Sequence, residues 1–228
     1  MAWLEKYYET IIETGYYKWL FDGFGNTVLI TLGALLIGIL IGSVIAIVKY
    51  FGEDVAAMKP ICWLCDLYVT VIRGIPVVVL LLITFFIIFA SSDDGVMVAI
   101  ITFGINSGAY MAELIRGGIQ AVDKGQMEAG RSLGLSKLQT MAKIIFPQAI
   151  RYILPAIGNE MIALLKETSV AGYVAVRDVT KASDQIRNLT YDSVSPLLTV
   201  ALTYLGLVVL MTALLNVVEK RLSKSDKR

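Results

Sequence analysis

Five long apolar runs dominate this chain of 228 residues. A helix needs about 20 predominantly apolar residues to cross the hydrocarbon core of a membrane. A composition of 57% hydrophobic and 17% charged residues, with a mean hydropathy of +0.71, is too apolar for a soluble domain of this size. We therefore predict an all-α integral membrane protein with five transmembrane helices, built from residues 28–48, 61–90, 96–115, 150–176 and 196–218.

The second run is interrupted by Arg73-Gly74-Ile75-Pro76. Proline breaks or bends a helix because it lacks an N–H donor and its ring clashes with the preceding turn. A stretch of about 30 residues is too short for two crossings and a turn. The sequence therefore predicts one bent helix, in which Arg73, Gly74 and Pro76 are candidates for structural or gating roles, as is Pro155 in the fourth run.

The predicted domain organisation has three parts. Residues 1–22 form an external interfacial amphipathic helix, because apolar and aromatic side chains recur there at helical spacing. Residues 23–220 form the transmembrane domain, and residues 221–228 form a basic cytoplasmic tail. Within the transmembrane domain the spans cover about 24–49, 61–90, 95–119, 148–175 and 194–218, and a cytoplasmic coupling loop covers about 120–147.

Basic residues set the predicted orientation. Thirteen lysines and arginines lie in the connection after the first span, in or beside the loop at 120–147, and in the C-terminal segment, against five on the opposite side. Cytoplasmic segments carry an excess of basic residues. The N-terminus is therefore predicted outside and the C-terminus in the cytoplasm.

Two spans carry ionisable groups at membrane depth. Asn106, Tyr110, Glu113 and Gly117 share one face of the third span, and the fourth carries Asn159, Glu160, Lys166 and Glu167. Such groups face protein or water rather than lipid, and they mark solute pathways or pair with one another. We take Asn159, Glu160, Glu113, Tyr110 and Lys166 as candidate substrate-pathway residues. The structural alternative pairs Glu113 with Arg116 or Arg73, and Glu160 with Lys166.

A polar loop between the third and fourth spans has helix start and stop signals. Asp123 with Gln126, and Ser136 with Gln139, have the form of N-terminal capping pairs. Gly134 can supply the left-handed residue that ends a helix. The loop is therefore predicted to be a helix, a glycine hinge and a second helix. In the first span, Gly38 and Gly42 form a Gly-x-x-x-Gly step, either a packing motif or the ordinary abundance of glycine in such helices.

Several kinds of chemistry are excluded or disfavoured. The chain has no histidine, and its net charge of +1 gives no electrostatic argument for nucleic acid. Cys62 and Cys65 have Cys-x-x-Cys spacing but lie in an apolar run, so we interpret them as inert thiols. No phosphate-binding Gly-x-x-x-x-Gly-Lys-Ser/Thr loop is present. We expect no catalytic residues, no metal site and no cofactor in this chain.

The polar loop resembles the EAA signature of ABC-transporter permease subunits. The matching segments are Glu128-Ala129-Gly130-Arg131-Ser132-Leu133-Gly134 and Ile144-Ile145-Phe146-Pro147. Gly130 stands where that family usually has Ala, and Phe146 where it has Leu. The segments 72–76, 107–110, 113–119, 122–126, 147–150, 154–160 and 165–169 resemble the polar amino-acid branch, except that Ile75 replaces the usual Thr. The resemblance covers roughly residues 20–220.

This resemblance implies the type I ABC importer permease fold and its partners. Two cytoplasmic ATPases would dock on the EAA loops through Glu128, Ala129, Gly130, Ser132, Leu133 and Gly134, and would bind the ATP and Mg²⁺. A second permease, identical or a close paralogue, would complete the pathway, and an extracytoplasmic binding protein would deliver the amino acid. The implied location is the bacterial cytoplasmic membrane, with lipid around the chain and no nucleic acid bound.

Glu113 and Glu160 against Lys166 make the predicted pathway slightly negative. That balance favours polar L-amino acids with cationic or amide side chains over acidic ones. A secondary amino-acid carrier is the alternative, but such carriers more often show inverted repeats, which the sequence does not display. A non-transporting scaffold has no need for carboxylates on interior faces.

Overall fold

The computed structural model describes residues 2–224, and all regular secondary structure in this range is helical. Three helices are long and apolar enough to cross a membrane: α2 (Tyr17–Gly52), α5 (Gly95–Gln120) and α10 (Val194–Lys224). α8 (Phe146–Glu167) is long enough, but its charged residues keep its hydropathy below that of a simple span. The five-span topology therefore stays a prediction. Residues 225–228 of the predicted basic tail lie outside the described residues, and 221–224 continue α10.

The predicted bent second helix is two helices in the structure. η2 (Ala56–Met58) leads into α3 (Lys59–Gly74), and α4 (Val77–Ile83) continues as a π-helical turn, η3 (Thr84–Ile88). These two halves meet at 104°, and together they are long and apolar enough to form one broken span or a re-entrant loop. Ile75 is extended, with φ −107° and ψ 130°. Proline pushes the residue before it out of the helical region, so Pro76 produces a break rather than a bend.

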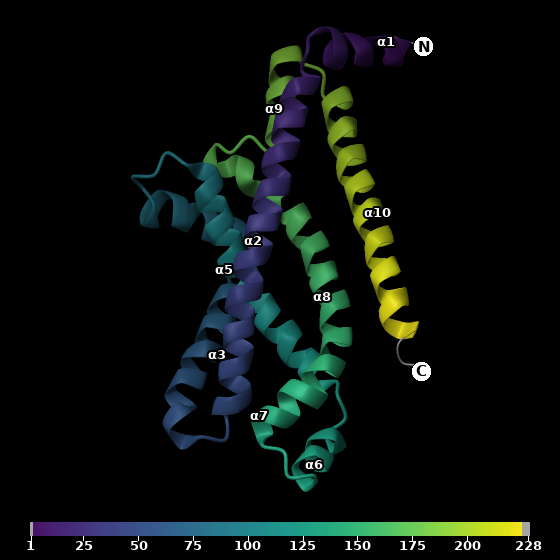
Figure 1. The fold of residues 1–228 in the computed structure, drawn as a ribbon. Helices are drawn as coiled ribbons and strands as arrows, with labels where there is room; N and C mark the ends of the chain where they lie inside the picture. The colour runs from purple at the N-terminus through teal and green to yellow at the C-terminus, as the bar shows by residue number, and fades with distance from the viewer. Residues whose placement is uncertain (1, 225–228) are drawn as a thin grey trace.

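α2 and α5 form the centre of the bundle (Figure 1), and glycines let them approach closely. A Cβ added to Gly42 would lie 2.7 Å from the backbone nitrogen of Ala112, and one on Gly38 would lie 2.7 Å from Ser107 Oγ. Two glycines of α5, at positions 104 and 108, meet α2 side chains equally closely. The Gly-x-x-x-Gly step is therefore a packing motif.

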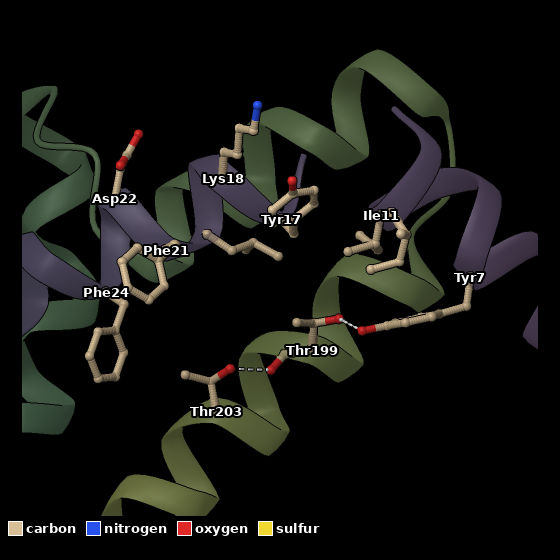
Figure 2. Close-up of a pocket in the computed structure, with 11 residues that line it drawn as sticks. Tyr7, Ile11, Tyr17, Lys18, Phe21, Asp22, Phe24, Thr199 and Thr203 are labelled. Carbon is tan, nitrogen blue, oxygen red and sulfur yellow. Dashed lines mark hydrogen bonds between the residues drawn. The ribbon is translucent and has the colours of Figure 1, made fainter. Parts of the chain in front are cut away.

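The N-terminal segment is shorter than predicted and is not one regular helix. α1 (Ala2–Tyr7) continues as a π-helical turn, η1 (Tyr8–Glu13), and the chain reverses at Gly15, which has φ +76°. α2 then begins at Tyr17, inside the region expected to be external. A cavity of about 660 Å³ separates η1 and the start of α2 from α10, and the Thr199 hydroxyl donates to Tyr7 Oη across it at 3.3 Å (Figure 2).

The two ends of the bundle differ (Figure 1). α1 and α9 (Val179–Thr190) lie at one end. The other end carries α6 (Gly125–Ser132), α7 (Lys137–Thr140) and the connection between α2 and α3. η4 (Met141–Ile145) leads from α7 into α8, and η5 (Thr168–Val174) follows α8. α10 diverges from the bundle, so most of its apolar surface is exposed within the monomer.

A buried apolar cluster holds α2, α4, α5 and α8 together. Its fully buried members include Ile30, Leu81, Phe103 and Leu164. Both cysteines are free thiols. Because α8 packs on α5 through this cluster, the polar side chains of α8 that face α5 are held at fixed positions.

Candidate functional site

A polar cluster lies between α5 and α8 inside the bundle. The Ser107 hydroxyl donates to Glu160 Oε1 at 3.2 Å, and the Asn106 side-chain amide donates to Glu167 Oε2 at 3.3 Å. Asn106 and Ser107 are buried, and both glutamates are half-buried. The glutamates are seven residues apart, which places them two turns apart on one face of α8. Neither carboxylate forms an ion pair with any residue that the structure describes.

A second polar cluster surrounds Glu113 on α5. Arg116 donates to both carboxylate oxygens of Glu113, at 3.3 and 3.0 Å, and Arg73 lies 3.9 Å from the same carboxylate. The Arg73 guanidinium also lies over the Tyr110 ring, 5.0 Å from its centroid. Arg73 lies in the last turn of α3, shortly before the break at Pro76. This cluster therefore ties the broken helix to α5 by charge and by a cation–π contact.

The structure brings together only some of the predicted pathway residues. Glu160 faces α5, but Asn159 is exposed because adjacent helical residues differ by about 100° around the axis. Lys166 is exposed, and Glu160 bonds to Ser107 rather than to Lys166. Glu113 pairs with both Arg116 and Arg73, which are the partners that the structural alternative named.

The predicted site set omitted three residues. Ser107, Asn106 and Glu167 complete the α5–α8 cluster. A signal for Glu167 was present in the sequence, since it follows Glu160 at the heptad spacing that keeps residues on one helix face. Ser107 precedes Tyr110 by three positions, but one serine in a span has no distinctive pattern. Only the helix pairing shows that Ser107 meets a carboxylate.

The polar loop folds as predicted in its main features. α6 ends at a turn in which Gly134 has φ +84°, a conformation that glycine adopts without strain. Ser136 and Gln139 form the reciprocal capping box that opens α7, at 3.2 and 2.8 Å. The predicted capping pair of Asp123 with Gln126 is wrong. Asp123 instead accepts from the backbone N–H of Gly125 at 2.7 Å in a tight local turn.

The residues that carry the EAA signature divide into exposed and buried members. Glu128, Ala129, Ser132 and Leu133 are exposed, and Leu133 retains 81% of its accessible surface. Leu138, on α7, retains 64%. Gly130 is buried against Thr140. Exposed leucines on a polar loop are typical of a protein-docking surface.

One ion pair ties this loop to the transmembrane helices. Lys137 at the start of α7 donates to Asp54, in the α2–α3 connection, at 2.8 Å. The hydrogen bond from Lys137 lowers the pKa of the Asp54 carboxyl. The same ammonium lies 5.3 Å from the ring centroid of Tyr50 on α2. The ion pair and the cation–π contact therefore join the start of α7 to the α2–α3 connection and to the end of α2.

Comparison with known proteins identifies this architecture. Residues 34–224 match the family described as the binding-protein-dependent transport system inner membrane component. The chain is 33% identical over 208 residues to the arginine transport system permease protein ArtQ of Bacillus subtilis, covering 90% of this chain and 93% of that protein. It is 37% identical over 206 residues to the probable glutamine ABC transporter permease protein GlnM of Bacillus subtilis, with the same coverage.

Solved structures agree. A crystal structure of an amino acid ABC transporter with histidines has a TM-score of 0.84 and 37% identity, covering 91% of this chain and 96% of that one. The MetNI methionine ABC transporter, in an inward-facing conformation, shares the fold with a TM-score of 0.78 at 20% identity, covering 89% of this chain and 95% of that one. This chain therefore belongs to the binding-protein-dependent inner membrane component family, as a permease of a polar amino-acid ABC importer with the type I fold.

Proposed function

We propose that this permease translocates polar L-amino acids past the α5–α8 polar cluster, with cationic or amide side chains favoured over acidic ones. The observation that carries this proposal is the pair of half-buried carboxylates, Glu160 and Glu167, which face Asn106 and Ser107. Their hydrogen bonds are to neutral donors, so each keeps capacity to accept from a substrate ammonium. The relatives named for arginine and glutamine support the same substrate class.

Asn159, Lys166, Glu113 and Tyr110 have secondary places in this proposal. Exposed Asn159 and Lys166 would face a cavity that is closed only when a second permease, identical or paralogous, is present. The Glu113 cluster with Arg73 and Tyr110 would act as a gate, because it joins the end of α3, beside the break at Gly74 and Pro76, to α5. Pro155, inside α8, would act as a structural or gating residue.

ATP hydrolysis belongs to a separate cytoplasmic subunit in this proposal. Two ATPases would dock on the exposed surface formed by Glu128, Ala129, Ser132, Leu133 and Leu138, next to a cavity of about 630 Å³ that Glu128 helps to line. Gly130 and Gly134 would shape that surface. An extracytoplasmic binding protein would deliver the substrate at the end that carries α9. The bacterial cytoplasmic membrane, with the N-terminus outside and α6 and α7 in the cytoplasm, fits this arrangement.

The test compares uptake of labelled amino acid by the complete transporter in proteoliposomes. Glu160→Gln keeps the size of the side chain and removes its charge. A hydrogen bond to a charged group contributes about 1.5–3 kcal/mol, so uptake at subsaturating substrate should fall roughly tenfold or more. Glu167→Gln should give a comparable loss. Glu5→Gln, an exposed carboxylate on α1, is the matched control and should leave uptake unchanged.

Equal uptake by wild type and both variants at subsaturating substrate would reject the α5–α8 cluster as the pathway. Uptake that proceeds without ATP would instead favour a secondary carrier.

A further inference from the structure

An apolar groove and a polar pocket meet at the end of the bundle that carries α6 and α7. The groove has a volume of about 510 Å³ and lies between α2, α5, η4 and α8. The pocket has a volume of about 450 Å³. Tyr50 and Ile119 line both cavities, and Lys137 lines the pocket while the next residue, Leu138, lines the groove. The two cavities are therefore adjacent.

The groove has the dimensions of a lipid acyl region in one leaflet. Its wall on α2 extends from Ile39 to Phe51, a distance of about 18 Å at 1.5 Å per residue. Half of a hydrocarbon core about 30 Å thick is about 15 Å. Ser43 and the Tyr50 hydroxyl are its polar side-chain groups, and the other lining side chains are apolar. Ordered water needs two or more polar partners, so the groove suits an apolar chain.

The pocket at the end of this groove has the chemistry of a headgroup site. Its bases are Arg116, Lys124 and Lys137, and its acids are Glu53 and Asp54. Asp54 accepts one hydrogen bond from Lys137, and Glu113 accepts the two hydrogen bonds that Arg116 donates. An ammonium has three donors, so Lys137 retains donors for a second oxyanion. Lys124 and Glu53 also line this pocket, and neither forms an ion pair among the described residues.

We propose that this composite cavity binds one anionic glycerophospholipid, with an acyl chain in the groove and the phosphate at Lys124 and Lys137. Basic pockets between helices at the cytoplasmic side of a membrane favour anionic headgroups. The bound chain would fill the space between α2 and the segment η4–α8, which carries α7. The lipid would thus hold the ATPase-docking loop against the end of α2, alongside the ion pair of Lys137 with Asp54.

The test is native mass spectrometry of the intact permease–ATPase complex, titrated with phosphatidylglycerol or with phosphatidylcholine of the same acyl chains. We expect one tightly held phosphatidylglycerol per permease and weaker retention of phosphatidylcholine. A basic residue near an anionic surface contributes about a fivefold effect. Lys124→Gln should therefore weaken phosphatidylglycerol retention about fivefold, and Lys124→Gln with Lys137→Gln about twenty-five-fold.

Two further variants separate the parts of the site. Lys143→Gln removes an exposed lysine of η4 that lines neither cavity, and it should retain lipid like wild type. Ala142→Trp places a large ring in the groove and should reduce retention of both lipids.

Four results would overturn the proposal. Equal retention of the two lipids would show that the lysines do not select an anionic headgroup. Retention unaffected by Ala142→Trp would show that the lipid does not occupy the groove. Crosslinking between two copies of the permease through Ser43→Cys would show that a second subunit, rather than lipid, fills the groove. Inorganic phosphate that stabilises the complex as well as phosphatidylglycerol does would also contradict a lipid site.

Discussion

Gly130 departs from the EAA signature for a reason that the structure supplies. That signature usually has Ala at this position, and Ala is about 1 kcal/mol better than Gly in a helix. A Cβ on Gly130 would overlap Thr140 Cγ2 and lie 2.8 Å from its Oγ1 and 3.1 Å from its Cβ. Thr140 is the last residue of α7 and is fully buried. A β-branched side chain such as threonine has few rotamers in a helix. The threonine therefore has little room to yield.

The expected effect of Gly130→Ala follows from two opposing contributions. Overpacking a tight contact costs about 1–3 kcal/mol, and the helix gain returns about 1 kcal/mol. The net loss of stability is therefore about 0–2 kcal/mol. It weakens the contact between α6 and α7, and this contact sets the positions of Leu133 and Leu138. We expect weaker retention of the ATPase on heating and lower substrate-stimulated hydrolysis.

A double-mutant cycle isolates the contact. Thr140→Ala removes Cγ2 and Oγ1, and the carbonyl of Ser136 keeps its bond from the backbone N–H of residue 140 at 2.9 Å. The combined variant should be more stable than the two single effects predict, with a coupling energy of about 1 kcal/mol or more. Gly25→Ala is the control, because its added Cβ meets nothing within 4 Å. Strictly additive effects of Gly130→Ala and Thr140→Ala would refute the steric explanation.

Three further predictions concern the hinge, the packing and the topology. Gly134→Val should permit membrane insertion but abolish coupled ATP hydrolysis, because a β-branched residue resists φ +84°; normal coupled turnover would contradict this. Gly42→Ala should lower the melting temperature of the complex through about 1–3 kcal/mol of overpacking between α2 and α5, whereas Gly206→Ala, with open space around it, should not. In a chain without its native cysteines, Ser91→Cys should react with an impermeant thiol reagent added outside intact cells and Ser132→Cys should not; the reverse pattern would reject the orientation.

Local sequence signals predicted the loop well because they act over a few residues. The box of Ser136 with Gln139 and the left-handed Gly134 require only backbone geometry and neighbouring side chains. Asp123 had the same form of signal but formed a competing turn with Gly125, since a short acidic side chain can bond two residues ahead. Capping pairs therefore identify helix starts better than they identify the bonds made there.

Tertiary placement limited the prediction of the substrate pathway. Periodicity placed Glu160 and Asn159 on the correct helix, but which neighbour packs on that helix decides which of them is interior. Ser107, rather than Lys166, became the partner of Glu160 because α5 approaches α8 on that face. The break at Pro76 had a local signal, because proline pushes the residue before it out of the helical region, but the 104° angle between the two halves had none.

The most direct test of the proposed function is ATP-driven uptake by the wild-type permease, reconstituted with its ATPase and binding protein in proteoliposomes. ATP is supplied to the compartment that the coupling loop faces, and arginine, glutamine and glutamate are compared at equal concentration. We expect ATP-dependent accumulation of arginine or glutamine ahead of glutamate, because the carboxylates of Glu160 and Glu167 would line the proposed pathway. Accumulation without ATP, or a preference for glutamate, would contradict it.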